Sequence, residues 1–357
     1  MRRRSRIAIV FFAVLLVGAV AIALRALDAM GVFTDVAPVA CLQPEPIPGI
    51  AGVQDLRYDA PSNALFIAAT DLRPWPAHPS PADGLYVSRP GALAPAVRLS
   101  GTAADFHPFG IALFRGTDGS LTLMAINRPA HGKPVVDIFA VSDPAIAKIA
   151  LHESEAVAGD LLVSPAGIAA VDKGRFYATN GHTGKTGLWA ALENALLLPR
   201  ADIVYFDGSD FRIAAGDLRF AAGIGESADG THLYVAETTG RDIRTYARNI
   251  FSGDLELAGR LPVPSGVGNL DASEAGALFV AGRAKLPDLF GDRANPTASS
   301  PSEVFRVALD AQGIPRSAKL VWSATDTGAV TAGVPLRNRL LIASGYHSKI
   351  LSCALRQ

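Results

Sequence analysis

The chain has 357 residues, of which 49% are hydrophobic and 18% charged, so it can bury a large core. Its 33 lysines and arginines balance 33 aspartates and glutamates, which gives a formal net charge of zero. Because no basic excess is available to attract phosphate backbones, the composition argues against nucleic-acid binding.

Residues 1–25 are predicted to be a cytoplasmic basic stretch followed by a transmembrane anchor or signal segment. The stretch RRRSR precedes residues 7–24, eighteen residues without a charge. At about 1.5 Å per residue such a helix measures roughly 27 Å, close to the bilayer core of about 30 Å. The basic stretch stays cytoplasmic, so we expect an inner-membrane anchor with the rest of the chain in the periplasm. Cleavage after residues 21–23 would instead give a secreted protein.

Residues 26–40 are predicted to be a linker, and residues 41–357 contain strand-like runs that recur roughly every 45 to 60 residues. The first set begins at Ala64, Leu121, Arg175, His232, Ala277 and Arg339. Each run is followed by a second one, beginning at Gly84, Val135, Asp202, Asp242, Glu303 and Lys349. Six copies of a strand pair separated by turn residues predict an all-β fold, a six-bladed β-propeller.

The stretch GLWAALENALLLPRA, residues 187–201, departs from the strand pattern. Its apolar residues recur near helical spacing, at Leu188, Trp189, Leu192, Ala195 and Leu196. This indicates an amphipathic helix inserted in blade three. Two roles are open: a cap packed on the propeller, or a lid or membrane-facing helix at the mouth of the channel.

The chain has two cysteines, Cys41 and Cys353, one near each end of the expected propeller. In an oxidising compartment a disulfide between them would fasten the last blade to the segment that enters the first. The alternative is a pair of unrelated buried thiols.

Several segments carry a family likeness, among them DFHPFGIALF, FYATNGH, FAAGIGESADGTHLYVAE and RLLIASGYHSKILSC. Over residues 41–353 the chain resembles the serum paraoxonases and bacterial arylesterases, whose propellers are related to gluconolactonases and strictosidine synthases. The resemblance implies ester or lactone hydrolysis, a disulfide between the terminal cysteines, and two calcium ions in the central channel. Calcium takes about six to eight oxygen ligands, so several blades would have to supply carboxylates and carboxamides.

The repeat also predicts which residues line the channel. The six aligned pairs are Gln54-Asp55, Phe109-Gly110, Ala166-Gly167, Ala222-Gly223, Gly268-Asn269 and Ala332-Gly333. Only Asp55 and Asn269 match the metal ligands that the resemblance implies, while Gln54 keeps an oxygen without the charge. A divalent ion with so few oxygens would be poorly compensated for its lost water. We therefore expect no cofactor, calcium included.

Other positions are candidates for a ligand site at the mouth. Phe109 and Arg128 replace the histidine pair of the family, Arg283 replaces another mouth histidine, and His182 matches a family histidine. Gln54, Phe109, Arg128 and Arg283 are thus candidate ligand-binding residues, and two arginines would suit a small apolar or carbonyl-bearing molecule. His182 and Glu226 are candidate catalytic residues, the latter as a carboxylate whose pKa an apolar funnel would raise.

Three functions follow from these residues. The first is an ester- or lactone-hydrolase relative that works without metal or only binds a small molecule. The second is a true arylesterase or lactonase with a rearranged metal site, formed by Gln54, Asp55, Asn269, Asp271 and Glu226. The third is an envelope interaction scaffold that uses the loop of residues 284–302 as its contact surface.

Overall fold

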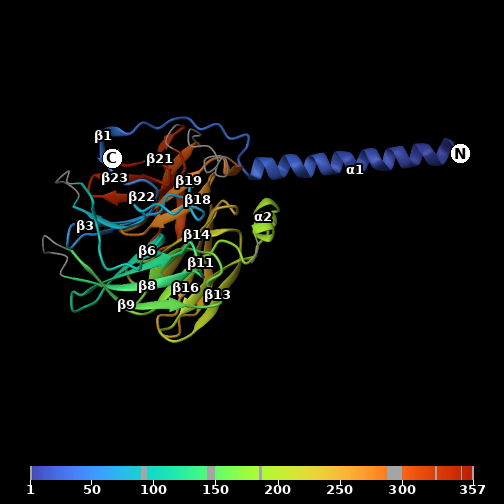
Figure 1. Ribbon diagram of the computed structural model, residues 1–357. Helices are drawn as coiled ribbons and strands as arrows, with labels where there is room; N and C mark the ends of the chain where they lie inside the picture. The colour runs from blue at the N-terminus through green and yellow to red at the C-terminus, as the bar shows by residue number, and fades with distance from the viewer. Residues whose placement is uncertain are drawn as a thin grey trace.

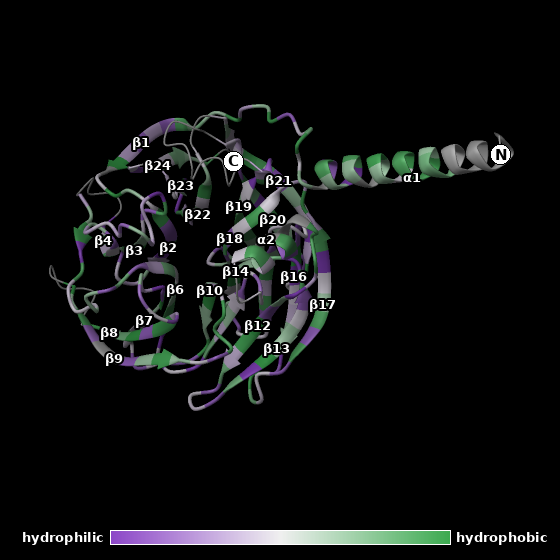
Figure 2. Cartoon of the chain, turned by 45° about the vertical axis from the view of Figure 1, so that its right-hand side comes forward, coloured by the Kyte–Doolittle hydropathy of each residue, from purple (hydrophilic) through white to green (hydrophobic). Residues whose placement is uncertain are grey.

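The computed structural model describes residues 2–89, 95–142, 149–184, 187–287, 300–325, 328–346 and 348–355. These residues form six four-stranded sheets arranged as the blades of a β-propeller around a central channel (Figures 1 and 2). The predicted fold class is confirmed. The helix α1 (Arg2–Ala29) projects from the ring as a long rod (Figure 1).

The strands follow the blades in chain order, except that the first strand belongs to the last blade. Blades one and two are β2 (Val53–Asp59), β3 (Ala64–Ala69), β4 (Gly84–Ser88), β5 (Val97–Arg98), then β6 (Pro108–Arg115), β7 (Leu121–Asn127), β8 (Val135–Val141), β9 (Leu151–Ala158). Blades three and four are β10 (Pro165–Ala170), β11 (Phe176–Asn180), β12 (Ala201–Phe206), β13 (Phe211–Leu218), then β14 (Ala221–Glu226), β15 (His232–Glu237), β16 (Asp242–Arg248), β17 (Leu255–Pro262). Blades five and six are β18 (Gly266–Asp271), β19 (Ala277–Arg283), β20 (Ser302–Leu309), β21 (Pro315–Ala324), then β22 (Val330–Leu336), β23 (Arg339–Ser344), β24 (Lys349–Ala354) and β1 (Leu42–Pro48).

Both sets of predicted runs are strands of the blades. The first set forms the second strand of each sheet, for example β3, in which every residue is buried. A short apolar run of this kind is typical of a strand covered on both faces. Here the covering layers are the neighbouring blades, whose buried side chains form apolar clusters between successive sheets.

The innermost strands are β2, β6, β10, β14, β18 and β22, which contact one another in that order and close the ring from β22 back to β2. Each carries a β-bulge near its start. In blades two to five the bulge contains both residues of the predicted channel pair. In blade six it contains Thr331, so the pair predicted there was placed one residue too late.

Glycines in these bulges let neighbouring blades approach closely. A Cβ atom on Gly167 would lie 2.4 Å from the carbonyl oxygen of Ala222, and one on Gly223 would lie 2.6 Å from the Cα of Asn269. Side chains therefore cannot be added at these positions without moving the next blade. The small residues of the channel are explained by this packing.

The ring is closed by the first strand and a disulfide. β1 pairs antiparallel with β24, and Cys41 and Cys353 form a disulfide with a Cα–Cα distance of 5.1 Å. The disulfide spans 312 residues of sequence and joins the last blade to the segment that leads into β1. The alternative of two unrelated thiols is wrong.

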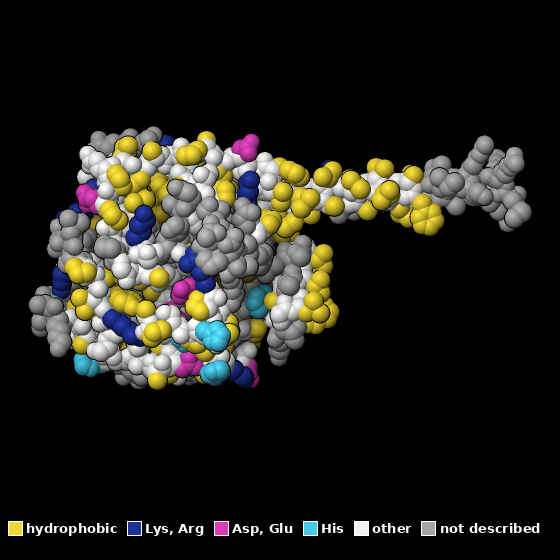
Figure 3. Space-filling view, turned by 45° about the horizontal axis from the view of Figure 1, so that its top comes forward, with side chains coloured by type: hydrophobic (Ala, Val, Ile, Leu, Met, Phe, Trp, Pro, Cys, Tyr) yellow, Lys and Arg dark blue, Asp and Glu magenta, His cyan; other side chains and the backbone are white. Residues whose placement is uncertain are grey.

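The predicted helix of blade three is α2 (Gly187–Ala195), between β11 and β12. Its apolar side chains face outward: Leu188 is 70% exposed and Trp189 is 61% exposed. The side turned to the protein carries Glu193, which is buried and accepts a hydrogen bond from the backbone N–H of Thr183 at 3.1 Å. A cap packed through its apolar face is therefore wrong. The surface view shows a group of apolar side chains protruding on the side from which the long helix projects (Figure 3).

The apolar part of α1, Phe11–Asp28, is long and apolar enough to cross a membrane, with a mean hydropathy of 2.1. A signal sequence has the same properties. The chain just beyond this helix is tied to blade five, where the N–H of Leu286 donates to the carbonyl of Met30 at 3.0 Å. Both helices project from the same side of the propeller (Figure 1).

Candidate functional site

The candidate ligand-binding residues gather at the end of the channel where the inner strands begin, which we call the mouth. Because β7, β11 and β19 are antiparallel to the inner strands, their last residues reach this end. Asn127 pairs with Pro108, Asn180 with Pro165, and Arg283 with Gly266. This geometry places Phe109, Arg128, His182 and Arg283 at the mouth, which is also the side of α2.

Arg128 is a half-buried cation whose one resolved side-chain contact is with an aromatic ring. The centre of its guanidinium lies 4.2 Å from the centroid of the Phe109 ring, a cation–π contact. Its Nε atom is buried, and within the described ranges no hydrogen bond or ion pair engages the guanidinium. Burial lowers the pKa of Arg128 to about 10, so the group stays protonated at neutral pH. Cations withdrawn from water are costly without a partner, which leaves Arg128 ready to bind an anionic or carbonyl oxygen.

His182 lies near enough to Arg128 for the charge of the guanidinium to affect it. Burial lowers the pKa of His182, and the charge of Arg128 lowers it further, against the opposite influence of Glu193. A hydrogen bond with the backbone of Gly184 also acts against the lowering of this pKa. The imidazole is therefore neutral at pH 7, and its Nδ1 is buried. Ser164 fixes the backbone, because its hydroxyl donates to the carbonyl of His182 at 2.7 Å and accepts from its N–H at 2.9 Å.

The loop between β3 and β4 adds an apolar wall to the mouth. Trp75 contacts Phe109 edge to face, with ring centroids 5.5 Å apart. His107 anchors the end of this loop: its Nδ1 lies 2.8 Å from Asp83 and its Nε2 lies 2.9 Å from Asp105. The sequence did not reveal Trp75 or this clasp, because the partners of His107 are set by the loop conformation.

The two residual metal positions are engaged by the protein itself. Asp55 is fully buried; one of its oxygens accepts from the N–H of Leu56 and from Arg57, and the other accepts from the N–H of Ile111 at 3.0 Å. Burial raises its pKa to about 6, although Arg57 and the N–H groups act in the opposite direction.

The two carboxamides that were expected to face the channel donate hydrogen bonds within the protein through their nitrogen atoms. The Asn269 side chain donates across the ring to the carbonyl of Gln54 at 2.7 Å, and the Gln54 amide donates to the carbonyl of Thr70 at 2.8 Å. In the described parts of the chain, no three His, Cys, Asp or Glu side chains are grouped as metal ligands would be.

Arg283 lies in blade five, opposite the blade of Arg128 across the ring. Its Nε atom is buried. The interaction loop predicted after it falls largely outside the described residues, since residues 288–299 are not among them. Of its described part, Ala284 and Leu286 are buried next to the start of the linker.

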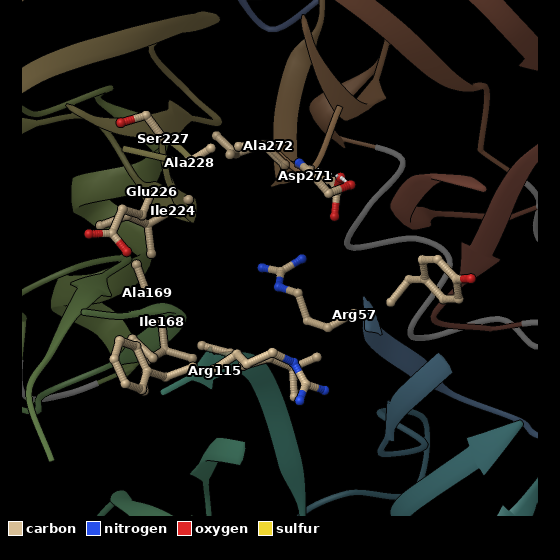
Figure 4. Close-up of a pocket in the computed structure, with 18 residues that line it drawn as sticks. Arg57, Arg115, Ile168, Ala169, Ile224, Glu226, Ser227, Ala228, Asp271 and Ala272 are labelled. Atoms are coloured by element: carbon tan, nitrogen blue, oxygen red, sulfur yellow. Dashed lines mark hydrogen bonds between the residues drawn. The ribbon is translucent and has the colours of Figure 1, made fainter. Parts of the chain in front are cut away.

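Glu226 lies at the other end of the channel, at the last residue of β14, and the structure does not bring it together with His182. It lines a cavity of about 350 Å³ with Arg57, Arg115 and Asp271 (Figure 4). Burial raises the pKa of Glu226 to about 7, although its ion pair with Arg248, 2.9 Å long, acts against this. The sequence identified Glu226 but not Arg57, whose position in the channel depends on where β2 ends.

Comparisons with known proteins agree with this architecture. The arylesterase family model matches residues 81–355. Human serum paraoxonase/arylesterase 1 is 29% identical over 258 residues, which cover 71% of this chain and 69% of the relative. Human serum paraoxonase/arylesterase 2 is also 29% identical, over 71% of this chain and 70% of the relative.

Two solved structures share the fold at low identity. A luciferin-regenerating enzyme superposes with a TM-score of 0.54 at 12% identity, covering 88% of this chain and 94% of that one. A protein assigned as a gluconolactonase superposes with a TM-score of 0.53 at 14% identity, covering 91% of this chain and 95% of that one. These likenesses agree with the six-bladed β-propeller fold and carry no more than the fold. The family match is more specific, and the chain belongs to the arylesterase family.

Proposed function

We propose that this propeller hydrolyses small, mostly apolar esters or lactones at the mouth of its channel without a bound calcium ion. The observation that supports this most is Arg128, a half-buried guanidinium held against Phe109 with no protein anion paired to it among the described residues. A fixed cation beside an aromatic ring suits an oxygen that becomes negative during reaction.

The hydrogen bonds of the expected calcium positions support the metal-independent part of the proposal. Both oxygens of Asp55 already accept hydrogen bonds, two of them from backbone N–H groups. Gln54 and Asn269 keep carboxamides, but the third and fourth channel pairs carry only alanine and glycine, and at Gly167 a longer side chain would meet the neighbouring blade. Such a donor set does not fit the six to eight oxygens, roughly, that calcium takes.

The chemistry we propose uses two residues. The neutral imidazole of His182 takes a proton from water, and the water oxygen forms a bond to the carbonyl carbon. Arg128 donates hydrogen bonds to the oxyanion of the tetrahedral intermediate. As the carbonyl re-forms, the bond to the leaving oxygen breaks, and that oxygen takes the proton from His182.

The same proposal includes a membrane setting. α1 would anchor the protein, or direct its export, with the propeller on the oxidising side where the disulfide is stable. The exposed apolar face of α2, on the same side as α1, would then lie toward the bilayer. Apolar esters and lactones that partition into lipid would reach the mouth directly.

The pH dependence of hydrolysis tests the role of His182. A base acts only when it is unprotonated, so kcat/KM for phenyl acetate should be level near pH 8 and should fall on acidification. Because the pKa of His182 is lowered, the midpoint of this fall should lie below the ordinary histidine value of about 6.5.

Glu226 is the matched control, because its pKa of about 7 is close enough to produce a similar profile. The acidic limb should persist in Glu226→Gln. Its disappearance in that variant would assign the base to Glu226, and the absence of turnover with both phenyl acetate and δ-valerolactone would contradict the proposed hydrolysis.

A further inference from the structure

The end of the channel opposite the mouth opens into a cavity, which we call the lower cavity. It has a volume of about 350 Å³ and lies at the ends of inner strands from blades one to five. Sites for small molecules measure roughly 300 to 1,000 Å³, so a molecule of monosaccharide size fits it. None of the residues assigned above to the mouth lines it.

Three charged side chains from three blades face this cavity with unused hydrogen-bonding atoms. Arg57 uses Nη1 for Asp55 and for the carbonyl of Leu56, which leaves Nε and Nη2 without a partner in the described chain. Glu226 binds Arg248 through Oε1, which leaves Oε2. Asp271 accepts from the N–H and hydroxyl of Ser273 through Oδ1, which leaves Oδ2.

The arrangement of these groups limits the ligand. Arg57 extends toward the middle of the cavity, with Glu226 and Asp271 on the walls around it (Figure 4). A metal ion is disfavoured because the guanidinium lies where it would have to bind. A small anion is disfavoured because Asp271, which forms no ion pair among the described residues, would repel it, while the charge of Arg57 is already offset by Asp55 at 3.1 Å.

Hydroxyl groups satisfy all three side chains together, because each can donate to a carboxylate and accept from a guanidinium. The C–H faces of such a molecule would contact Phe114, Ala228 and Ala272, which belong to the apolar part of the lining and are not fully buried. Arg115 does not compete for the ligand, since its guanidinium is taken by Asp59 and by the carbonyl of Gly119.

We infer that the lower cavity is a binding site for a small neutral polyhydroxylated molecule, separate from the ester site at the mouth. The two sites share the channel but use different residues. The inference stands on the cavity and its three side chains, whether or not the mouth hydrolyses esters.

Calorimetric titration of the full-length protein in detergent with D-glucose and with myo-inositol tests the inference. At least one of the two should bind, and Asp271→Asn and Glu226→Gln should each weaken its binding by about tenfold or more. The exposed acids Asp254 and Glu256 provide the matched controls Asp254→Asn and Glu256→Gln, which should bind as the wild type does. Thermal unfolding midpoints show which variants are folded. If Asp271→Asn or Glu226→Gln does not fold, Ala228→Leu takes its place, because the larger side chain narrows the cavity and should likewise weaken binding.

Three results would overturn the inference. One is no heat of binding with either polyol up to roughly 100 mM. Another is binding that Asp271→Asn and Glu226→Gln leave unchanged, or that Arg128→Met abolishes, since the polyol would then lie elsewhere. The third is binding of methylammonium in preference to both polyols, which would make the cavity a cation site.

Discussion

The double variant Cys41→Ser/Cys353→Ser should lose about 2 to 5 kcal/mol of its free energy of unfolding. The disulfide holds together positions 312 residues apart, so its removal frees the unfolded chain from a very large loop. It also frees the end of β24. The hydrogen bonds of the antiparallel ladder then have to hold β24 and β1 together. Urea unfolding of the wild type and the variant measures the loss. The two free energies of unfolding are compared with the same dependence on urea concentration for both proteins.

Wild-type protein reduced with dithiothreitol is the control, because it keeps both sulfur atoms and lacks only the bond. It should match the double variant within about 1 kcal/mol. A double variant as stable as the oxidised protein would show that the strand ladder alone closes the ring.

The second large effect is expected at the mouth. Arg128→Met should lower kcat/KM for phenyl acetate by about 10²- to 10³-fold, the usual cost of removing one donor to an oxyanion. Methionine keeps the apolar contact with Phe109 but cannot donate a hydrogen bond. Steady-state hydrolysis of phenyl acetate by the purified full-length variant measures the loss.

The stability of Arg128→Met distinguishes this role from a structural one. A half-buried cation without a paired anion costs free energy, so its removal should leave the unfolding midpoint unchanged or raise it. Arg212 is the matched control, because it makes the same kind of cation–π contact away from the mouth. It lies on the outer strand β13, and its guanidinium is 5.1 Å from the ring centroid of Tyr205. Arg212→Met should hydrolyse phenyl acetate normally, and a loss below threefold, roughly, in Arg128→Met would contradict its assigned role.

Much of the propeller could be predicted because its second and third strands are covered on both sides. Burial on two faces demands apolar residues in an unbroken run, as in Ala277–Arg283, and six such runs are visible without a structure. The outer strands were not predicted. Leu255–Pro262 alternates between exposed and half-buried residues, and its composition does not differ from that of a loop.

The sequence repeat predicts which residues of the candidate site lie at the mouth of the channel, but not the contacts that they make. Phe109, Arg128 and His182 follow from strand register, and the structure places all three at the mouth. What could not be predicted is which groups they meet. The hydrogen bond from Ile111 to Asp55 joins two blades, and the direction of the α2 apolar face depends on the loops at its ends.

The cavity at the other end was missed for the same reason. Arg57 follows the channel pair by two residues, and nothing in the repeat relates it to acidic residues of other blades. Its importance appears only when β2, β14 and β18 bring it together with Glu226 and Asp271.

The central claim is that the arylesterase fold has kept a carbonyl site at its mouth that does not depend on calcium. Its most direct test is the hydrolysis of phenyl acetate by full-length protein dialysed against EDTA, with bound calcium measured on the same sample by atomic emission. We predict unchanged kcat/KM with calcium far below one ion per chain. Turnover that is lost in EDTA and restored by added calcium would contradict the claim.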